Sequence, residues 1–317
     1  MQRIIFQPQY PTKMRYQEWW VDAFEREFMM NGFEVKTLGY EQYTREAQEP
    51  DYGLFSPLHY ASKFEMIQMH EYLSTIQLRD DDILFMADIS YPGFFPHVLF
   101  HKRPSKVFSF CHATSINYLD YYAENSDYKF PIETSIAKMC DKVFVGSYYH
   151  AEKLCWDNTL VTYLPFFDLM REKCSKNIKK NRQFLMMSAS RKNIQKVDEL
   201  LESKVETKFG KIFRPYCNEW HEYFENLGNS KILLITSFED TFGYQIIDGY
   251  LHKCVVLAPN RCAYPEILPK EYLYNNEEEL FEKIEDVKNG KLLPATSLLC
   301  EEQMKNFFKN IMEEMQK

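Results

Sequence analysis

The amino-acid sequence predicts an α/β protein made of two doubly wound domains, each a parallel sheet covered by crossover helices. Short apolar runs of strand length alternate with longer segments of helical periodicity along most of the chain, which is typical of such sheets. The clearest unit begins with the apolar run Lys231–Ser237, turns at Phe242-Gly243, continues as a helix over residues 244–251 and ends in the apolar run Cys254–Ala258. A strand, a glycine turn, a helix and a second strand make one βαβ unit, whose ligands bind at the carboxyl edge of its strands.

Length and composition agree with two globular domains. The chain has 317 residues, of which 45% are hydrophobic and 26% charged, an ordinary balance for a folded protein. No apolar run reaches the ~18 residues that a membrane-spanning helix needs, and the N-terminus lacks a signal-peptide core, so we expect a soluble, cytoplasmic protein. The eight cysteines form no CxxC pair, which argues against a zinc site, and scattered cysteines in a chain without a secretion signal indicate reduced thiols.

The charge distribution argues against one class of nucleic-acid binder. The net charge is −8, and residues 1–165 carry 15 basic and 22 acidic side chains, against 23 and 24 in residues 166–317. A protein that binds nucleic acid without regard to sequence presents a broadly basic surface to the phosphates. The charge count therefore excludes a uniformly basic binder but leaves room for a local basic groove.

Residues 1–165 are expected to form the first domain. Apolar runs predict its strands, helical periodicity predicts helices at about 15–31 and 58–75, and Ser147 is placed to cap a further helix. The predicted strands lie at residues 3–8, 33–38, 81–87, 106–111, 141–146 and 159–164. The loops at 8–12 and 88–93 follow two of these strands and lie at the ligand edge.

A basic segment separates this domain from the second. Residues 166–183 are interpreted as the linker, because 170–183 holds six basic residues and one Glu; a solvated hinge and a phosphate-facing lip both fit that pattern. Residues 184–297 are expected to form the second domain, and 298–317 an amphipathic helix that packs back on the first. The predicted second-domain strands lie at 184–188, 209–214, 231–237 and 254–258, and its helices at 194–203, 218–226, 244–251 and 277–288.

Two carboxylates bracket the glycine turn of the βαβ unit. Asp240 precedes the turn and Asp248 lies eight residues later on the helix, whose N-terminus offers free N–H groups to a phosphate. This D-x7-D pattern resembles the E-x7-E signature of retaining GT-B glycosyltransferases of the family-4-like superfamily. Tyr264–Tyr274 is similar to the matching segment of the tRNA-queuosine mannosyltransferase branch. The resemblance implies a GT-B architecture, two Rossmann-like domains that face each other across a cleft.

The resemblance also implies roles for residues of the second domain. Arg191 and Lys196 match an R-x4-K element that grips the donor diphosphate in place of a metal ion, which is chemically sensible because fixed cations stabilise a leaving diphosphate. Asp240 would touch the transferred sugar, with Glu239 as its rival, and Asp248 the ribose hydroxyls. Donor contacts are further implied for Phe242, Gly243, Tyr244 and Glu266, and a catalytic role for His112 of the first domain.

The sequence departs from the family pattern at several positions. Asp replaces the usual Glu at both acidic positions, and Lys253 stands where the family usually has Gly. The loop after the first strand is Gln7–Thr12 rather than a Gly-rich turn. A single Asp near a helix start is commonly an N-cap, and a single His is commonly structural. Asp240 can therefore also be interpreted as an N-cap, and His112 as a structural residue.

The resulting hypothesis is a retaining, metal-independent glycosyltransferase that uses a nucleotide-sugar such as a UDP- or GDP-sugar, needs no other cofactor, and acts on a nucleic-acid base. A hydroxylated base in DNA and a modified tRNA base are the candidate acceptors, and a flipped base needs an aromatic pocket. The alternatives are a lipid, saccharide or small-molecule acceptor, or a non-catalytic nucleotide-sugar-binding protein. The acceptor-side candidates are Gln9, Tyr10, Asp88 and Tyr91, and further aromatic candidates are Tyr118 and Tyr122.

Overall fold

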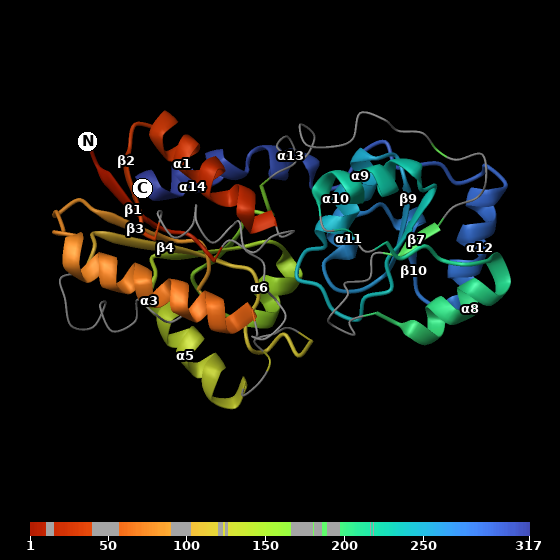
Figure 1. Cartoon of the computed structure of the whole chain (residues 1–317), viewed down its shortest axis with the longest axis horizontal. Helices are drawn as coiled ribbons and strands as arrows, with labels where there is room; N and C mark the ends of the chain where they lie inside the picture. Colours follow the sequence, from red (N-terminus) through yellow and green to blue (C-terminus); the bar gives the residue numbers. More distant parts are fainter. Residues whose placement is uncertain are drawn as a thin grey trace. The chain divides into compact units, whose positions relative to one another are not determined.

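The computed structural model divides into two compact units (Figure 1). Unit 1 comprises Met1–Val145, Leu154–Val161 and Phe308–Lys317, and unit 2 comprises Gly146–Lys153 and Thr162–Phe307. The residues that the structure describes are 1–10, 16–39, 57–89, 103–119, 123, 126–165, 180, 186–188, 197–215, 217 and 219–317.

Unit 1 is built on a six-stranded parallel sheet with the order β2-β1-β3-β4-β5-β6. The central strand β1 pairs with β2 on one side and β3 on the other, with Ile4 opposite both Val35 and Ile83. Ile4, Ile5 and Phe6 have no exposed surface, as expected for a parallel strand covered on both faces. The strands are β1 (Arg3–Gln7), β2 (Glu34–Thr37), β3 (Ile83–Met86), β4 (Lys106–Cys111), β5 (Lys142–Val145) and β6 (Thr159–Val161).

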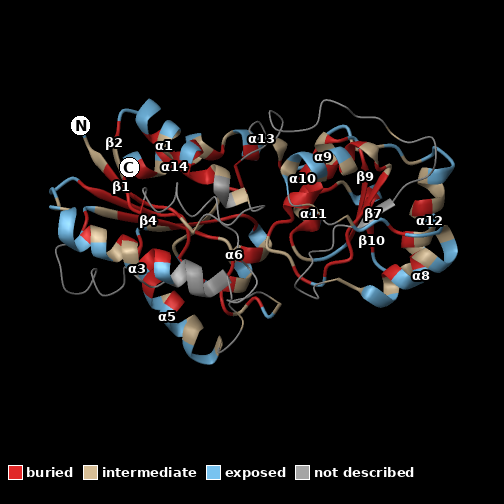
Figure 2. Ribbon diagram, in the orientation of Figure 1, coloured by how far each residue is buried: buried red, intermediate tan, exposed pale blue. Residues whose placement is uncertain are grey.

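Aromatic side chains join one helix of unit 1 to this sheet and a second helix to the first. Phe24 of α1 packs against Phe85 of β3 with ring centroids 5.0 Å apart, and Phe308 of α14 packs on Phe24 at 5.2 Å. The Lys106 ammonium also donates to the Met315 carbonyl oxygen at 2.9 Å, so the C-terminal helix belongs to this unit. Figure 2 shows the buried strands of this sheet in red, with α1 and α14 on one side and α3 and α5 on the other. The helices of unit 1 are η1 (Tyr16–Trp19), α1 (Trp20–Met30), α3 (Pro57–Thr75), α5 (Ser126–Met139) and α14 (Phe307–Gln316).

Unit 2 holds a second parallel sheet of four strands, in the order β10-β9-β8-β7. Its strands are β7 (Met186–Ser188), β8 (Ile232–Leu234), β9 (Val255–Pro259) and β10 (Leu273–Tyr274). Two parallel sheets with crossover helices confirm the α/β class predicted from the sequence. The helices are α6 (Tyr148–Leu154), α8 (Glu199–Phe209), α9 (Trp220–Asn229), α10 (Tyr244–Leu251), α11 (Tyr264–Ile267), η2 (Lys270–Tyr272), α12 (Glu277–Lys288) and α13 (Glu301–Lys305).

Helix α10 lies unusually close to the sheet of unit 2. A Cβ atom on Gly249 would come within 2.6 Å of Val256 Cγ2 and 2.8 Å of Leu233 Cδ2, side chains of β9 and β8. Only glycine allows this approach, and the contact fixes the helix that the predicted βαβ unit places beside the ligand edge.

Two secondary-structure predictions are wrong, and one helix of unit 1 was not predicted. Residues 209–214 do not form a strand, because α8 continues to Phe209 and ends at Gly210, where φ is +101°. The helix expected over 298–315 breaks at Asn306 into α13 and α14. Helix α5 was not predicted; it carries Pro131 in its interior, a residue that usually argues against a helix.

The domain boundaries predicted at 165 and 298 also differ from the two units. Residues 146–153, expected in the first domain, cluster with unit 2, and so do residues 298–307, expected with the C-terminal helix. The Ser147 hydroxyl donates to the Thr241 carbonyl oxygen at 2.5 Å, which ties the start of α6 to the loop after β8. Hydrogen bonds of this kind cannot be read from hydrophobic periodicity.

Lys253, which replaces a family glycine, lies in a left-handed turn with φ of +56°. It directly follows the C-cap of α10, where the Cys254 N–H donates to the Gly249 carbonyl at 2.8 Å and the Lys253 N–H to the Tyr250 carbonyl at 3.0 Å. These two bonds define a Schellman motif, whose left-handed residue is usually Gly. The replacement of the family glycine by Lys253 therefore affects the C-terminal end of α10, where it places a lysine in a strained backbone conformation.

We expect Lys253→Gly to raise the free energy of unfolding by about 1 kcal/mol, because glycine adopts the left-handed conformation without the steric cost that lysine bears. The Lys253 side chain is exposed, so little packing is lost. Chemical denaturation measures the change, and Lys231→Gly, at the start of a strand region, is the control expected to destabilise. An unchanged or lower stability for Lys253→Gly would show that the turn is not strained.

Candidate active site

The loop between β8 and α10 holds Asp240 at the carboxyl edge of the second sheet. Its Oδ1 accepts a hydrogen bond from the Phe242 N–H at 3.2 Å, and its Oδ2 accepts one from Gln245 Nε2 at 3.0 Å. Asp240 therefore shapes the turn, yet it does not cap the helix, because the N-cap position is occupied by Gly243. The carboxylate is half-buried and lies beside the start of α10.

Gly243 gives this turn its conformation. Its φ is +94°, in the left-handed region, and a Cβ atom would lie 2.8 Å from Cε1 of the buried Tyr264 ring. The N-cap residue, a glycine, has no side chain to cap α10, and within the described residues no side chain is seen to accept a hydrogen bond from its first N–H groups. The first N–H groups of a helix have no partner within the helix, and together with the positive end of the helix dipole they form a site for an anion such as phosphate.

Glu239, the alternative to Asp240 as the acid of this turn, forms an ion pair. Its side chain is 3% exposed, and one carboxylate oxygen contacts the Lys153 ammonium of α6. A buried carboxylate held by a cation has a structural role of its own. The contact favours Asp240 as the carboxylate available at the turn.

Asp248 is completely buried within α10. Its Oδ2 accepts a hydrogen bond from the Tyr223 hydroxyl of α9 at 3.0 Å. His252 Nδ1 lies 2.8 Å from the Asp248 carbonyl oxygen, and burial lowers the pKa of this His, which favours its neutral form. The sequence offered no structural reason for an Asp in mid-helix, and Tyr223 supplies one.

Glu266 holds the start of α6. Its carboxylate accepts the Tyr148 N–H at 2.8 Å and the Tyr149 N–H at 2.7 Å, and burial raises its pKa. The prediction that Ser147 caps this helix is confirmed, because Ser147 Oγ accepts the His150 N–H at 3.1 Å. Glu266 therefore occupies a helix N-terminus of the protein itself, and its predicted donor contact remains a prediction.

Arg261 is a cation at the same sheet edge that the sequence reasoning missed. Its Nε and Nη2 donate to the Ser237 carbonyl oxygen at 3.2 and 2.9 Å, and its guanidinium lies 5.1 Å from the Phe238 ring centroid. The signal in the sequence was its position two residues after the end of β9. Arg191 and Lys196, the predicted diphosphate-binding pair, lie outside the described residues.

Lys180, from the segment interpreted as a linker, is anchored in the interior of unit 2. Its ammonium donates to the Leu227 carbonyl oxygen at 3.2 Å and also contacts the Ser230 carbonyl oxygen, at the C-terminal end of α9. Burial lowers its pKa. Neither the solvated hinge nor the phosphate-facing lip describes this residue, which satisfies the free carbonyls of a helix end.

His112 follows β4 at the carboxyl edge of the first sheet. Its ring packs against Trp20 at 4.5 Å and Phe110 at 4.8 Å between centroids. The loop after it is braced by Glu133 of α5, whose carboxylate accepts both the N–H and the hydroxyl of Ser115. The missed helix α5 thus supplies the residue that orders the His112 loop.

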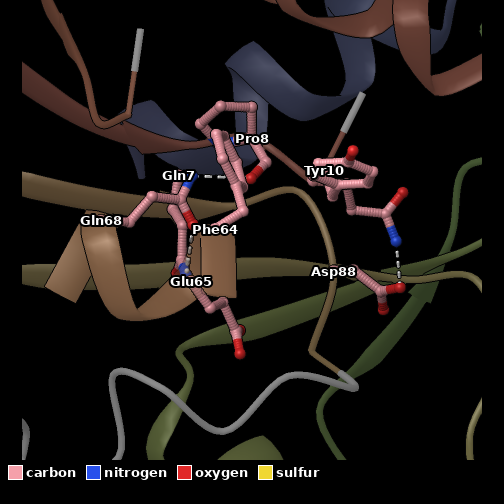
Figure 3. Close-up of a pocket in the computed structure, with 8 residues that line it drawn as sticks. Gln7, Pro8, Tyr10, Phe64, Glu65, Gln68 and Asp88 are labelled. Atoms are coloured by element: carbon pink, nitrogen blue, oxygen red, sulfur yellow. Dashed lines mark hydrogen bonds between the residues drawn. The ribbon is translucent and has the colours of Figure 1, made fainter. Parts of the chain in front are cut away.

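Gln9, Tyr10 and Asp88 line one pocket of unit 1, and Figure 3 labels Tyr10 and Asp88 there. Gln9 Nε2 donates to the Asp88 carboxylate, and the Tyr10 ring packs edge-on against Phe64 at 5.8 Å. Of the other aromatic candidates, Tyr118 is 63% exposed. Tyr91 and Tyr122 lie outside the described residues.

Comparison with known structures identifies the architecture. The galactosyltransferase WaaB of the lipopolysaccharide outer core superposes with a TM-score of 0.63 and 10% identity, covering 99% of both chains. Sucrose-phosphate synthase of Thermosynechococcus elongatus gives 0.60 and 12%, covering 100% of this chain and 94% of that one. The chain has the GT-B fold. Another GT-B structure, an α-glucosyltransferase in complex with UDP and a 13-mer DNA containing an HMU base, gives 0.56 and 12%, covering 100% of both chains.

Sequence comparison gives a shorter match. The tRNA-queuosine α-mannosyltransferase of Drosophila melanogaster is 34% identical over 88 residues, which are 28% of this GT-B chain and 22% of that protein. The match thus covers less than a quarter of the length of this curated relative. No protein-family model matches the chain. Within the described parts of this GT-B protein, no helix is long and apolar enough to cross a membrane.

Proposed function

We propose that the chain is a glycosyltransferase that transfers a sugar from a nucleotide-sugar donor to a nucleic-acid base. The observation that carries the proposal is the uncapped N-terminus of α10, opened by Gly243 and flanked by the half-buried Asp240. Such a helix start binds a diphosphate, and the adjacent carboxylate can accept hydroxyl groups of the sugar attached to it. The local similarity to a tRNA mannosyltransferase supports the same assignment.

Transfer is proposed to proceed with retention and without a catalytic metal ion. Arg191 and Lys196 would neutralise the diphosphate, with the α10 N–H groups as further donors, because charge that develops on a leaving group is stabilised by fixed positive groups. Arg261, oriented by the Ser237 carbonyl, adds a third cation at this edge. Asp240 is proposed to position the transferred sugar, and His112 of unit 1 is proposed as a catalytic residue.

The acceptor is proposed to bind unit 1. Gln9, Tyr10 and Asp88 line one pocket there, and Tyr10 offers a ring on which a flipped base can stack. The resemblance to the tRNA-queuosine branch, and the DNA present in the α-glucosyltransferase structure, support a base in nucleic acid as the acceptor. Acceptor affinity should then fall with increasing salt, since phosphate contacts release counterions.

The donor half of the proposal is tested by thermal melting with UDP-, GDP-, ADP- and CDP-sugars, each with and without EDTA. A shift of a few degrees with one nucleotide, unchanged by EDTA, is the expected result, since a ligand that binds only the folded state raises the melting temperature. Transfer to hydroxymethylated DNA and to tRNA is then followed with the active donor, and NMR of the product reports the anomeric configuration. A shift that requires a divalent ion would overturn the metal-free mechanism.

The burial of Asp248 favours one alternative, a GT-B protein that binds nucleotide-sugars without transfer. A carboxylate with no exposed surface reaches ribose hydroxyls only if the α9–α10 contact opens. Turnover of the donor distinguishes the transferase from the binding protein. Donor binding without hydrolysis or transfer, tested with DNA, tRNA, saccharide and lipid acceptors, would establish the binding protein. Asp248→Asn should weaken donor affinity if the ribose contact is real.

A further inference from the structure

The pocket at the carboxyl end of β1 is lined by glutamines and carboxylates. Three elements contribute: the end of β1 with its following loop, helix α3, and the residue two positions after β3. The lining residues are Gln7, Pro8, Gln9, Tyr10, Phe64, Glu65, Gln68 and Asp88, all within unit 1 (Figure 3). The pocket has room for roughly one water-sized group, so it suits the end of a ligand rather than a whole one.

The glutamine amide nitrogens of this pocket point to protein acceptors. Gln68 Nε2 donates to the Pro8 carbonyl at 2.9 Å and the Leu38 carbonyl at 3.2 Å, Gln7 Nε2 donates to Gln68 Oε1 at 3.3 Å, and Gln9 Nε2 donates to Asp88. This chain of bonds fixes the orientation of each amide, because the reverse orientation would set oxygen against oxygen.

Two amide oxygens remain as acceptors. Gln7 is only 4% exposed, and its Oε1 makes no hydrogen bond to any residue in the described part of the chain; the same is true of the buried Gln9 Oε1. A buried acceptor without a donor is costly, and native structures rarely keep one unless a ligand or an ordered water supplies the hydrogen.

The chemistry of the lining selects the group that fits. Two amide oxygens and the carboxyl groups of Glu65 and Asp88 surround the space, so an anion such as phosphate is repelled. A carbonyl oxygen brings no hydrogen, and a hydroxyl brings one. An amino group brings two or three hydrogens and no negative charge, which matches an acceptor-rich site.

We propose that this pocket binds an amino group of the acceptor substrate, with Gln7 and Gln9 as its hydrogen-bond acceptors. The inference rests on the proposed function only in assigning the ligand to the acceptor. Two sources present this chemistry: the exocyclic amino group of a nucleobase, and a protonated aliphatic amine. Gln7 is then a specificity-determining residue for the acceptor.

The test titrates the full chain, without any donor, with cytidine, uridine and ethanolamine. Cytidine carries an amino donor where uridine carries a carbonyl acceptor, so the pair isolates the group in question. We expect cytidine to bind about tenfold more tightly than uridine, and Gln7→Met to lower cytidine affinity about tenfold and remove the preference. Gln2→Met is the matched control, because Gln2 precedes the same strand at its opposite end and should change nothing.

Each outcome assigns or removes the site. Binding of ethanolamine that depends on Gln7, without a cytidine preference, identifies an aliphatic amine as the source. Equal affinities for cytidine and uridine together with no Gln7-dependent ethanolamine binding, or no binding of any probe, would show that the pocket holds only an ordered water. Gln9→Met replaces Gln7→Met if the latter fails to fold.

A parallel UDP titration of the same variants keeps this inference apart from the proposed function. UDP affinity depends on unit 2 and should be equal in wild type, Gln7→Met and Gln2→Met. If UDP and the nucleotide-sugars do not bind while the cytidine preference persists, the transferase assignment fails and the amino-group pocket stands.

Discussion

Replacing Gly243 by alanine is expected to weaken nucleotide binding by unit 2 at least tenfold while leaving unit 1 folded. Alanine at φ of +94° costs about 1–2 kcal/mol in backbone strain. Its Cβ would also lie 2.8 Å from the fully buried Tyr264 ring, and such overpacking costs about 1–3 kcal/mol more. The backbone can relieve both only by turning the first N–H groups of α10 away from their present direction.

UDP affinity measured by calorimetry should therefore fall by at least tenfold, a loss of about 1.4 kcal/mol or more. Gly290→Ala is the matched control, because Gly290 also has a positive φ, +72°, but a Cβ there meets nothing within 4 Å. It should lower stability slightly and leave UDP affinity unchanged. Normal UDP binding by Gly243→Ala would show that the α10 N-terminus is not the phosphate site.

The parts of the fold that the sequence predicted well are those governed by hydrophobic pattern alone. Strand β4 and helices α10 and α12 have the predicted bounds, because an apolar strand or a strongly periodic helix is specified locally. The predicted strand at 209–214 failed because α8 extends to Phe209, and of the residues that follow only Phe213 makes a β-bridge, while the apolar Ile212 is buried without strand structure. An apolar pattern alone does not distinguish a strand from an irregular segment that also buries its side chains.

Residue types in the candidate site were predicted better than their contacts. The sequence located the glycine turn and Asp240, since a βαβ unit fixes which loop lies at the ligand edge. It could not show that Glu239 forms an ion pair with Lys153 or that Asp248 accepts a hydrogen bond from Tyr223. Nor could it show that Glu266 accepts hydrogen bonds from the first N–H groups of α6. Each of these partners lies at least 25 residues away in the chain, and only tertiary packing brings them together.

Asp240 and Glu239 are adjacent in the chain but have different partners, so replacing each of them should have a different effect on the transfer rate and on stability. Asp240→Asn is expected to lower the transfer rate about 100-fold with little change in UDP affinity or stability, as for the loss of one charged group near a reacting centre. Asparagine keeps an oxygen for the Phe242 N–H, and the Gln245 amide can rotate to accept from the new NH₂ group. The turn is thereby preserved and only the charge is removed.

Glu239→Gln gives the opposite pattern, because it leaves the Lys153 ammonium without its buried partner. We expect the free energy of unfolding to fall by about 1–3 kcal/mol and the rate per folded molecule to stay near that of wild type. Single-turnover kinetics at saturating donor and urea denaturation separate the two effects. If Glu239→Gln loses the rate and Asp240→Asn keeps it, the acid of the turn is Glu239, and the Lys153 ion pair must then open when the donor binds.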